Sequence, residues 1–116
     1  MSATLDQARG LLSSPASARS HSLRAACWLA RVALEDAVRD LLQRKSLEPG
    51  EGNMRSLLVC LEVAYLEDYA ALVVRAEYAW SRLSDASHHH AFELGPTFGE
   101  VNGLIDAVAL VEAGSR

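Results

Sequence analysis

The sequence predicts an all-α protein, a mainly antiparallel bundle of four or five helices that forms one helical domain over residues 1–116. Two observations predict this fold. Apolar residues recur at steps of three and four along most of the chain, which is the period of an amphipathic helix. Glycine and proline fall almost entirely between these periodic segments, and no segment has the alternating pattern of a strand. Short connections favour antiparallel neighbours.

The first half of the chain predicts a short helix over Ala3–Leu12 and a long one that ends near Ser46. Ser14 and Pro15 suit the N-cap and the first position of the long helix. Its apolar stripe consists of Leu23, Ala26, Cys27, Ala30, Leu34, Ala37, Val38 and Leu41. Its opposite face carries Arg24, Arg31, Glu35 and Arg39. The last two are spaced to form an ion pair one turn apart.

The middle of the chain predicts a loop over Leu47–Asn53 and a third helix over Met54–Tyr65, with Asn53 as its N-cap. Glu67 and Asp68 are expected in the first turn of a fourth helix, because the helix dipole favours acidic residues there. No glycine or proline divides these two helices, so their separation stays open at this point.

The fourth helix is expected to turn one face inward, formed by Tyr69, Leu72, Val73, Ala76, Trp80 and Leu83. The segment FELGPT then breaks the pattern. Thr97 and Glu100 have the spacing of a capping box, so a last helix is predicted over Phe98–Ala113, with Gly114 as its stop.

Several further residues are expected in contacts inside the bundle. Trp28, Trp80 and Tyr69 are expected in the core rather than as platforms for base stacking. Val63 is expected to contribute to a third helix that is apolar on most sides, and the solitary Cys27 and Cys60 are expected to be buried free thiols. Gly99 and Gly103 are expected to allow close packing of the last helix.

Composition limits the classes of function. Half of the residues are hydrophobic and 22% are charged, as in an ordinary soluble globular protein. The net charge of −4 argues against a broad basic face for nucleic acid but leaves room for a small basic cleft. No apolar run is long enough for a membrane span, and the start MSATLDQARG does not resemble a secretion signal, so a cytoplasmic location is expected. The mean hydropathy of +0.06 favours burial of some surface against a second subunit.

The segment AWSRLSDASHHHAFELGPT contains three of the four histidines of the chain. If the fourth helix continues through it, residues seven positions apart share one line of its surface, and these are Arg75, Arg82 and His89. On that helix His88 and His90 flank the line and Tyr78 lies beside it. Arginine binds phosphate through two hydrogen bonds, and histidine exchanges protons near neutral pH.

Such residues suit the cleavage of RNA, which carries its own nucleophile in the 2′-hydroxyl group. The reaction requires proton transfer and a cation that stabilises charge on the phosphate, and it requires no metal or cofactor. Three other interpretations of the histidines remain: a solvated helix end, a polar contact between subunits, and a metal site. His89 with Glu93 forms the one pair with metal-ligand spacing on a helix, because the H-x(3)-H pattern is absent. Arg82 also has a purely structural alternative, in which it forms an ion pair with Asp85.

Two motifs carry a resemblance to a known family. Arg82 is followed, after five or six residues, by His88 or His89, and the segment RAACWLARVALEDAVRDLLQ is an alanine-rich second helix. In these features the chain resembles the HEPN superfamily (higher eukaryotes and prokaryotes nucleotide-binding domains). The resemblance implies a metal-independent endoribonuclease of the toxin or defence type, with Arg82, His88 and His89 as catalytic residues.

Further implications of the resemblance concern substrate contacts and partners. RNA would be the substrate, and Arg75, Tyr78 and His90 would support its binding. A homodimer would bring two copies of the motif together, and an antitoxin-like protein is a possible partner. The alternative is a HEPN-like module without catalysis that dimerises and binds a protein or a nucleotide.

Overall fold

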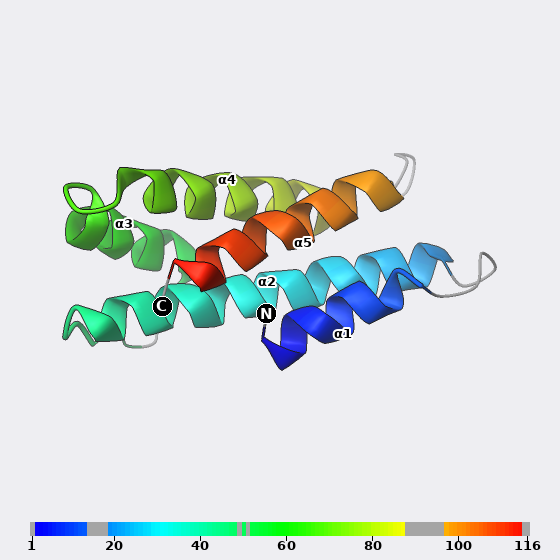
Figure 1. Ribbon diagram of the computed structural model, residues 1–116, viewed down its shortest axis with the longest axis horizontal. Helices are drawn as coiled ribbons and strands as arrows, with labels where there is room; N and C mark the ends of the chain where they lie inside the picture. Colours follow the sequence, from blue (N-terminus) through cyan, green and yellow to red (C-terminus); the bar gives the residue numbers. More distant parts are fainter. Residues whose placement is uncertain (1, 14–18, 49, 51, 88–96, 115–116) are drawn as a thin grey trace.

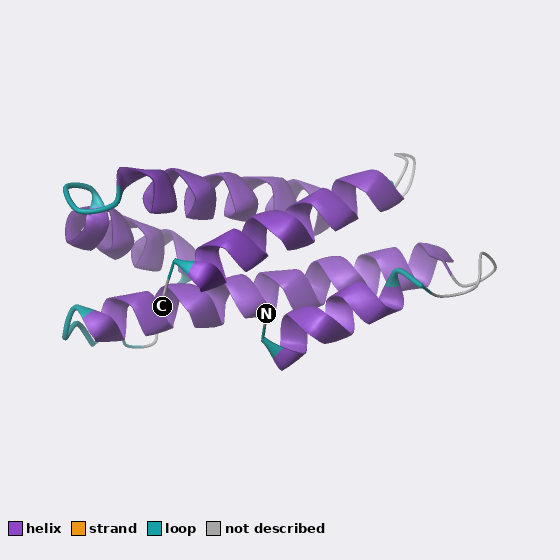
Figure 2. Ribbon diagram, in the orientation of Figure 1, coloured by secondary structure: helices purple, strands orange, loops and turns teal. Residues whose placement is uncertain are grey.

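The computed structural model describes residues 2–13, 19–48, 50, 52–87 and 97–114, and this part of the chain is built from helices without a strand. The helices are α1 (Ala3–Leu11), α2 (Arg19–Arg44), α3 (Met54–Tyr65), α4 (Ala70–Ser87) and α5 (Phe98–Ala113). Figures 1 and 2 show them as one elongated bundle. The predicted all-α fold is therefore confirmed. The expected cap at Ser14 and Pro15 lies outside the described residues.

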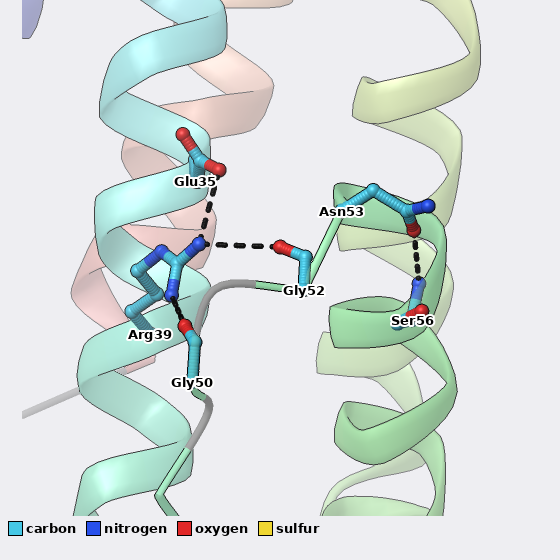
Figure 3. A network of polar contacts seen from close by, with 6 residues as sticks. All are labelled: Glu35, Arg39, Gly50, Gly52, Asn53 and Ser56. Atoms are coloured by element: carbon cyan, nitrogen blue, oxygen red, sulfur yellow. Dashed lines mark hydrogen bonds and ion pairs between the residues drawn. The ribbon is translucent and has the colours of Figure 1, made fainter.

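The 26-residue helix α2 is the centre of the bundle and contacts each of the other four helices. Helices α4 and α5 pack on α2 and on each other. Helix α1 lies against α2 and α5, and helix α3 lies against α2 and α4. Most neighbours are antiparallel, but α3 runs in the same direction as α2 because the segment between them turns back along α2 (Figures 1 and 3). The core therefore lies between α2, α4 and α5, with α1 and α3 at its flanks.

The apolar stripe of α2 supplies much of this core, and all eight of its predicted residues are buried. The helix ends at Arg44, two residues earlier than the sequence pattern indicates. Ser46 adopts a positive φ of 60°, and the backbone N–H of Leu47 donates to the carbonyl oxygen of Leu42 at 3.0 Å. This arrangement satisfies a carbonyl at the helix end and stops the helix there.

Helix α3 begins where the sequence predicts, and Figure 3 shows how its start is fixed. Arg39 on α2 donates hydrogen bonds to the carbonyl oxygens of Gly50 at 2.6 Å and Gly52 at 3.3 Å. It also pairs with Glu35 at 3.4 Å, as predicted. Asn53 Oδ1 then accepts from the backbone N–H of Ser56 at 2.9 Å and caps α3.

Replacing Asn53 with alanine is expected to lower the free energy of unfolding by about 1 kcal/mol, because the cap bond at the start of α3 is lost. Urea denaturation followed by circular dichroism measures the change. Asn53→Asp serves as the control, since aspartate caps equally well. Equal losses in both variants would show that the cap does not account for the effect.

Helices α3 and α4 are separate, but α4 begins at Ala70 rather than at Glu67. Asp68 lies in the turn between the helices, where its carboxylate binds Lys45 Nζ instead of capping α4. This hydrogen bond raises the pKa of Lys45. Tyr69 also precedes α4 and is 39% exposed, so its predicted place on the inner face is wrong. Its backbone N–H donates to the carbonyl oxygen of Tyr65 at 2.7 Å.

Helix α5 has the predicted bounds, and the hydroxyl of Thr97 accepts from the backbone N–H of Glu100 at 3.1 Å. Gly114 follows the helix with an ordinary negative φ, and a Cβ there would lie 2.6 Å from Cδ1 of Leu72. A side chain at this position would therefore have to displace the end of the Leu72 side chain on α4. Gly99 and Gly103 are different, because no atom lies within 4 Å of a Cβ placed on either. The prediction that these two glycines allow close packing is wrong.

Contacts between α1 and α5 bring the described ends of the chain together. Arg9 on α1 donates to Asn102 Oδ1 at 2.9 Å and pairs with Asp106 at 2.6 Å. The backbone N–H of Ser2 donates to Glu112 Oε1 at 3.1 Å. The short first helix is thereby held in the groove between α2 and α5.

Candidate functional site

Three of the predicted site residues lie on α4. Arg82 is exposed, and it forms no ion pair with a carboxylate in the part of the chain that the structure describes. The predicted alternative, a pair with Asp85, is therefore not observed. Arg75 lies seven residues earlier, and α4 is continuous between the two arginines. They are consequently about 10.5 Å apart along the helix axis and nearly aligned on its surface.

Arg75 and Tyr78 differ in their surroundings. Arg75 is half-buried, and its Nη1 donates to the hydroxyl of Tyr69 at 3.4 Å. Tyr78 is 56% exposed on the adjacent surface of α4. This flank of α4 therefore presents two guanidinium groups and a phenol, one of the guanidinium groups being held by a second tyrosine.

The predicted histidines His88, His89 and His90 lie outside the described residues. The last described residue before them is Ser87, at the end of α4, and Arg82 lies five residues earlier. Figure 1 shows that α4 ends at the same end of the bundle where α2 and α5 begin. Glu93, the suggested second metal ligand beside His89, also lies outside the described residues.

On the other flank of α4 lies a groove of about 680 Å³ between α3 and α4. Its apolar wall includes Met54, Leu58 and Val59, and Trp80 forms part of the opposite wall. The charged residues around it are Arg55, Glu62, Glu77 and Asp85, so carboxylates predominate. Ser84 also lines the groove, and its Oγ atom is buried without a hydrogen-bond partner among the described residues.

A cluster of two indoles and a guanidinium group lies next to this groove. The guanidinium carbon of Arg31 on α2 lies 5.5 Å from the ring centroid of Trp28 and 4.9 Å from that of Trp80 on α4. Trp80 is half-buried, whereas Trp28 is 61% exposed, so the prediction of a core position for Trp28 is wrong. The physical reason is that Trp28 shares the face of α2 with Arg24, Arg31 and Glu35, opposite the buried apolar stripe.

Sequence reasoning missed this cluster, although the spacing of its residues on α2 can be seen in the sequence. Arg24, Trp28 and Arg31 follow one another at steps of four and three, which places them on one stripe of α2. The contact with Trp80 depends on how α2 and α4 are aligned, and helical periodicity within one segment contains no information on that alignment.

The outer face of α3 is apolar and exposed. Val63, expected in a helix that is apolar on most sides, is 82% exposed, and Val59 on α3 and Leu66 directly after it are also exposed. The reason is that α3 contacts only α2 and α4 within the described fold, so its far side has nothing to pack against.

The two cysteines have different environments. Cys27 is buried, as predicted, and this burial raises the pKa of its thiol to about 11, with a smaller contribution from the Glu100 carboxylate. Cys60 on α3 is exposed, so the prediction of two buried thiols is wrong for Cys60.

Alkylation at pH 8 is therefore expected to modify Cys60 and to spare Cys27. The raised pKa of Cys27 lowers its thiolate fraction about a hundredfold relative to a thiol with the ordinary value of 9.0, and burial excludes the reagent as well. Iodoacetamide labelling followed by peptide mass spectrometry measures both sites. In the Cys60→Ser control, native protein should take up label only after denaturant is added. Equal labelling rates at both cysteines would contradict the buried position of Cys27.

Among the described residues, no group of three or more histidine, cysteine, aspartate or glutamate side chains is placed to hold a metal ion. No described helix is both long and apolar enough to cross a membrane.

Comparison with known proteins gives no match: no family model, no curated protein and no solved structure is significantly similar to the chain.

Proposed function

We propose that the protein is a metal-independent endoribonuclease that acts in the cytoplasm as a homodimer. Arg82 binds the scissile phosphate, and His88 or His89 transfers protons. Arg75, Tyr78 and His90 support substrate binding. The proposal follows the resemblance to the HEPN superfamily, which rests on the spacing of Arg82 and the two histidines and on the alanine-rich helix α2.

One observation carries the proposal: Arg82 is exposed near the end of α4, has no carboxylate partner among the described residues, and is aligned with Arg75. A guanidinium group that is not paired with an acid is available to a phosphate, and its five N–H donors can bind two phosphate oxygens at once. The histidines follow directly after α4 in the sequence, so proton-transfer groups and phosphate-binding groups are close along the chain.

The chemistry follows from the substrate. A histidine accepts the proton of the 2′-hydroxyl group while the 2′-oxygen attacks the adjacent phosphorus atom. The bond from phosphorus to the 5′-oxygen breaks, and that oxygen receives a proton. Arg82 stabilises the negative charge that develops on the phosphate oxygens. The products are a 2′,3′-cyclic phosphate and a free 5′-hydroxyl group.

The proposal is tested with purified protein and single-stranded RNA in the presence of a chelator. Cleavage is expected to continue, with cyclic phosphate ends detected by mass spectrometry. RNA whose 2′-oxygens are methylated should stay intact, because the nucleophile is blocked. The double variant His88→Ala/His89→Ala should lose cleavage while it keeps the helical circular dichroism spectrum. Intact RNA with the unmodified protein, or products with 5′-phosphate ends, would refute the proposal.

A second candidate function is a protein-binding module without catalysis, and the exposed apolar residues Val59, Val63 and Leu66 on α3 favour it. Exposed apolar groups on neighbouring turns gain free energy when a partner covers them. An antitoxin-like protein is one such partner. This candidate is preferred if the purified protein leaves RNA uncut and Val63→Glu abolishes binding to a protein that copurifies with the unmodified chain.

A further inference from the structure

We propose that Trp28, Arg31 and Trp80 form a platform on which an unpaired base of single-stranded RNA stacks. The choice of RNA rests on the proposed function. The platform is distinct from the cleavage site, because Trp80 and Arg82 are two residues apart on α4 and therefore point about 160° apart around the helix.

The first support is the exposure of Trp28. Indoles are usually well buried in folded proteins, yet 61% of Trp28 is accessible to solvent. A flat π-surface of this size stacks on any unpaired base, and such contacts do not require a particular sequence. Trp28 thus offers a ligand an apolar surface that the fold itself leaves uncovered.

The second support is the preorganisation of the cluster. The Arg31 guanidinium group lies within cation–π distance of both indoles, at 5.5 Å from Trp28 and 4.9 Å from Trp80. These contacts link α2 to α4 and restrict the rotation of the exposed indole. A stacking surface whose side chains are already ordered loses less conformational entropy when a ligand binds.

The third support is the charge around Trp28. Arg24 precedes Trp28 by one turn and Arg31 follows it by nearly one turn, so the indole lies between two cations on one stripe of α2. The nearest acid along that stripe, Glu35, is engaged by Arg39. A phosphate beside the stacked base can therefore meet the positive charge of Arg31.

The groove beyond Trp80 limits how much of the strand is bound. Its carboxylates, Glu62, Glu77 and Asp85, repel phosphate, so the strand does not continue through it. The platform consequently holds one or two nucleotides. A strand anchored at Trp28 reaches Arg82 only by crossing α4, so the stacked nucleotide lies apart from the phosphate that is cut.

The test uses the fact that Trp28 and Trp80 are the two tryptophans of the chain, so fluorescence excited at wavelengths that tyrosine does not absorb reports on the platform alone. The probe is a 2′-O-methyl oligoadenylate of about eight nucleotides, which spans the site and cannot be cleaved. Titration should quench the fluorescence of the unmodified protein. The Trp80→Phe variant, which retains Trp28, should show most of this quenching, and an RNA duplex of the same length should cause little.

Affinity measurements with variants make the proposal falsifiable. Trp28→Ala is expected to weaken binding by about 5- to 150-fold, and circular dichroism should confirm that this exposed substitution leaves the fold intact. Arg31→Ala should reduce the slope of log affinity against log salt by about 0.7, because it removes the cation that contacts both indoles. Arg44→Ala, which removes the same charge from the far end of α2, is the matched control. It should change neither the affinity for the probe nor the slope against salt.

The outcomes separate this proposal from the proposed function. Quenching at Trp28 with unmodified RNA left uncut supports the platform and refutes the nuclease. Cleavage of RNA with unchanged affinity in Trp28→Ala refutes the platform and leaves the nuclease standing. If Trp28→Ala changes the sedimentation of the protein but not its binding of the probe, Trp28 belongs to a protein interface and the platform is refuted.

Discussion

Replacing Arg82 with alanine is expected to lower the rate of RNA cleavage by about 10²- to 10³-fold, the usual cost of losing one group that stabilises transition-state charge. Because Arg82 is exposed on α4, its loss should leave the fold unchanged. Single-turnover cleavage of a labelled RNA measures the rate, and saturating protein separates the chemical step from binding. The main decrease should be in the chemical step, since the charge on the phosphate grows as the bond breaks.

Two further variants define what Arg82 contributes. Arg82→Lys keeps the charge but loses the planar fork, so it should recover only part of the lost rate. Arg44→Ala removes an exposed arginine from α2 far from the proposed site and should cleave like the unmodified protein. A rate in Arg82→Ala within about twofold of the unmodified protein would contradict the assignment of Arg82 to the scissile phosphate.

Replacing Leu34 with alanine is expected to lower the free energy of unfolding by about 3 to 5 kcal/mol. Leu34 is fully buried on α2, the helix that contacts all four others, so the cavity opens at the centre of the bundle. For a domain of this size the loss is a large part of the total stability. Urea denaturation followed by circular dichroism should give a lower midpoint with little change in the slope.

Leu110→Ala is the matched control because it makes the same chemical change at a leucine that is 51% exposed on α5. Its cost should be well below that of Leu34→Ala, since water already covers about half of the side chain. Similar losses in the two variants would contradict the central position of α2 in the core. A changed slope in Leu34→Ala alone would instead indicate a partly unfolded native state.

Local signals in the sequence predicted the elements well. Asn53 before α3 and Thr97 before α5 each form the expected cap, and both helices have the predicted bounds. Such signals work because a cap joins residues three positions apart and needs no tertiary contact. The predicted start of α4 is wrong, and a tertiary contact is involved there. Asp68 lies before α4 and binds Lys45 just after α2, a contact between distant segments that the local pattern does not contain.

Burial was predicted less well than helix formation. Periodicity correctly placed Leu34 inside, whereas the expectation of a core position for Trp28 followed from its aromatic side chain alone and is wrong, because Trp28 is exposed. An apolar side chain is buried only if a neighbouring helix reaches it. Helix α3 has neighbours on one side only, and this does not follow from the pattern of a single helix.

For the candidate site, spacing correctly aligned Arg75 and Arg82, because both lie on the same continuous helix. The cluster around Arg31 joins two helices that are separated by α3 in the sequence, so it depends on tertiary alignment. The assignment of proton transfer to His88 or His89 stays a prediction, since both residues lie outside the described part of the chain.

The position of α2 has a consequence for the order of assembly. Helices α1 and α2, and likewise α3 and α4, are neighbours in the sequence and form two antiparallel hairpins (Figure 1). Each hairpin closes a short loop and can form early in folding. The contact between α2 and α5 must wait, because α3 and α4 lie between them along the chain. Docking of α5 therefore completes the core, because α5 packs on α1, α2 and α4, while the two hairpins also contact each other directly through α2 with α3 and α4.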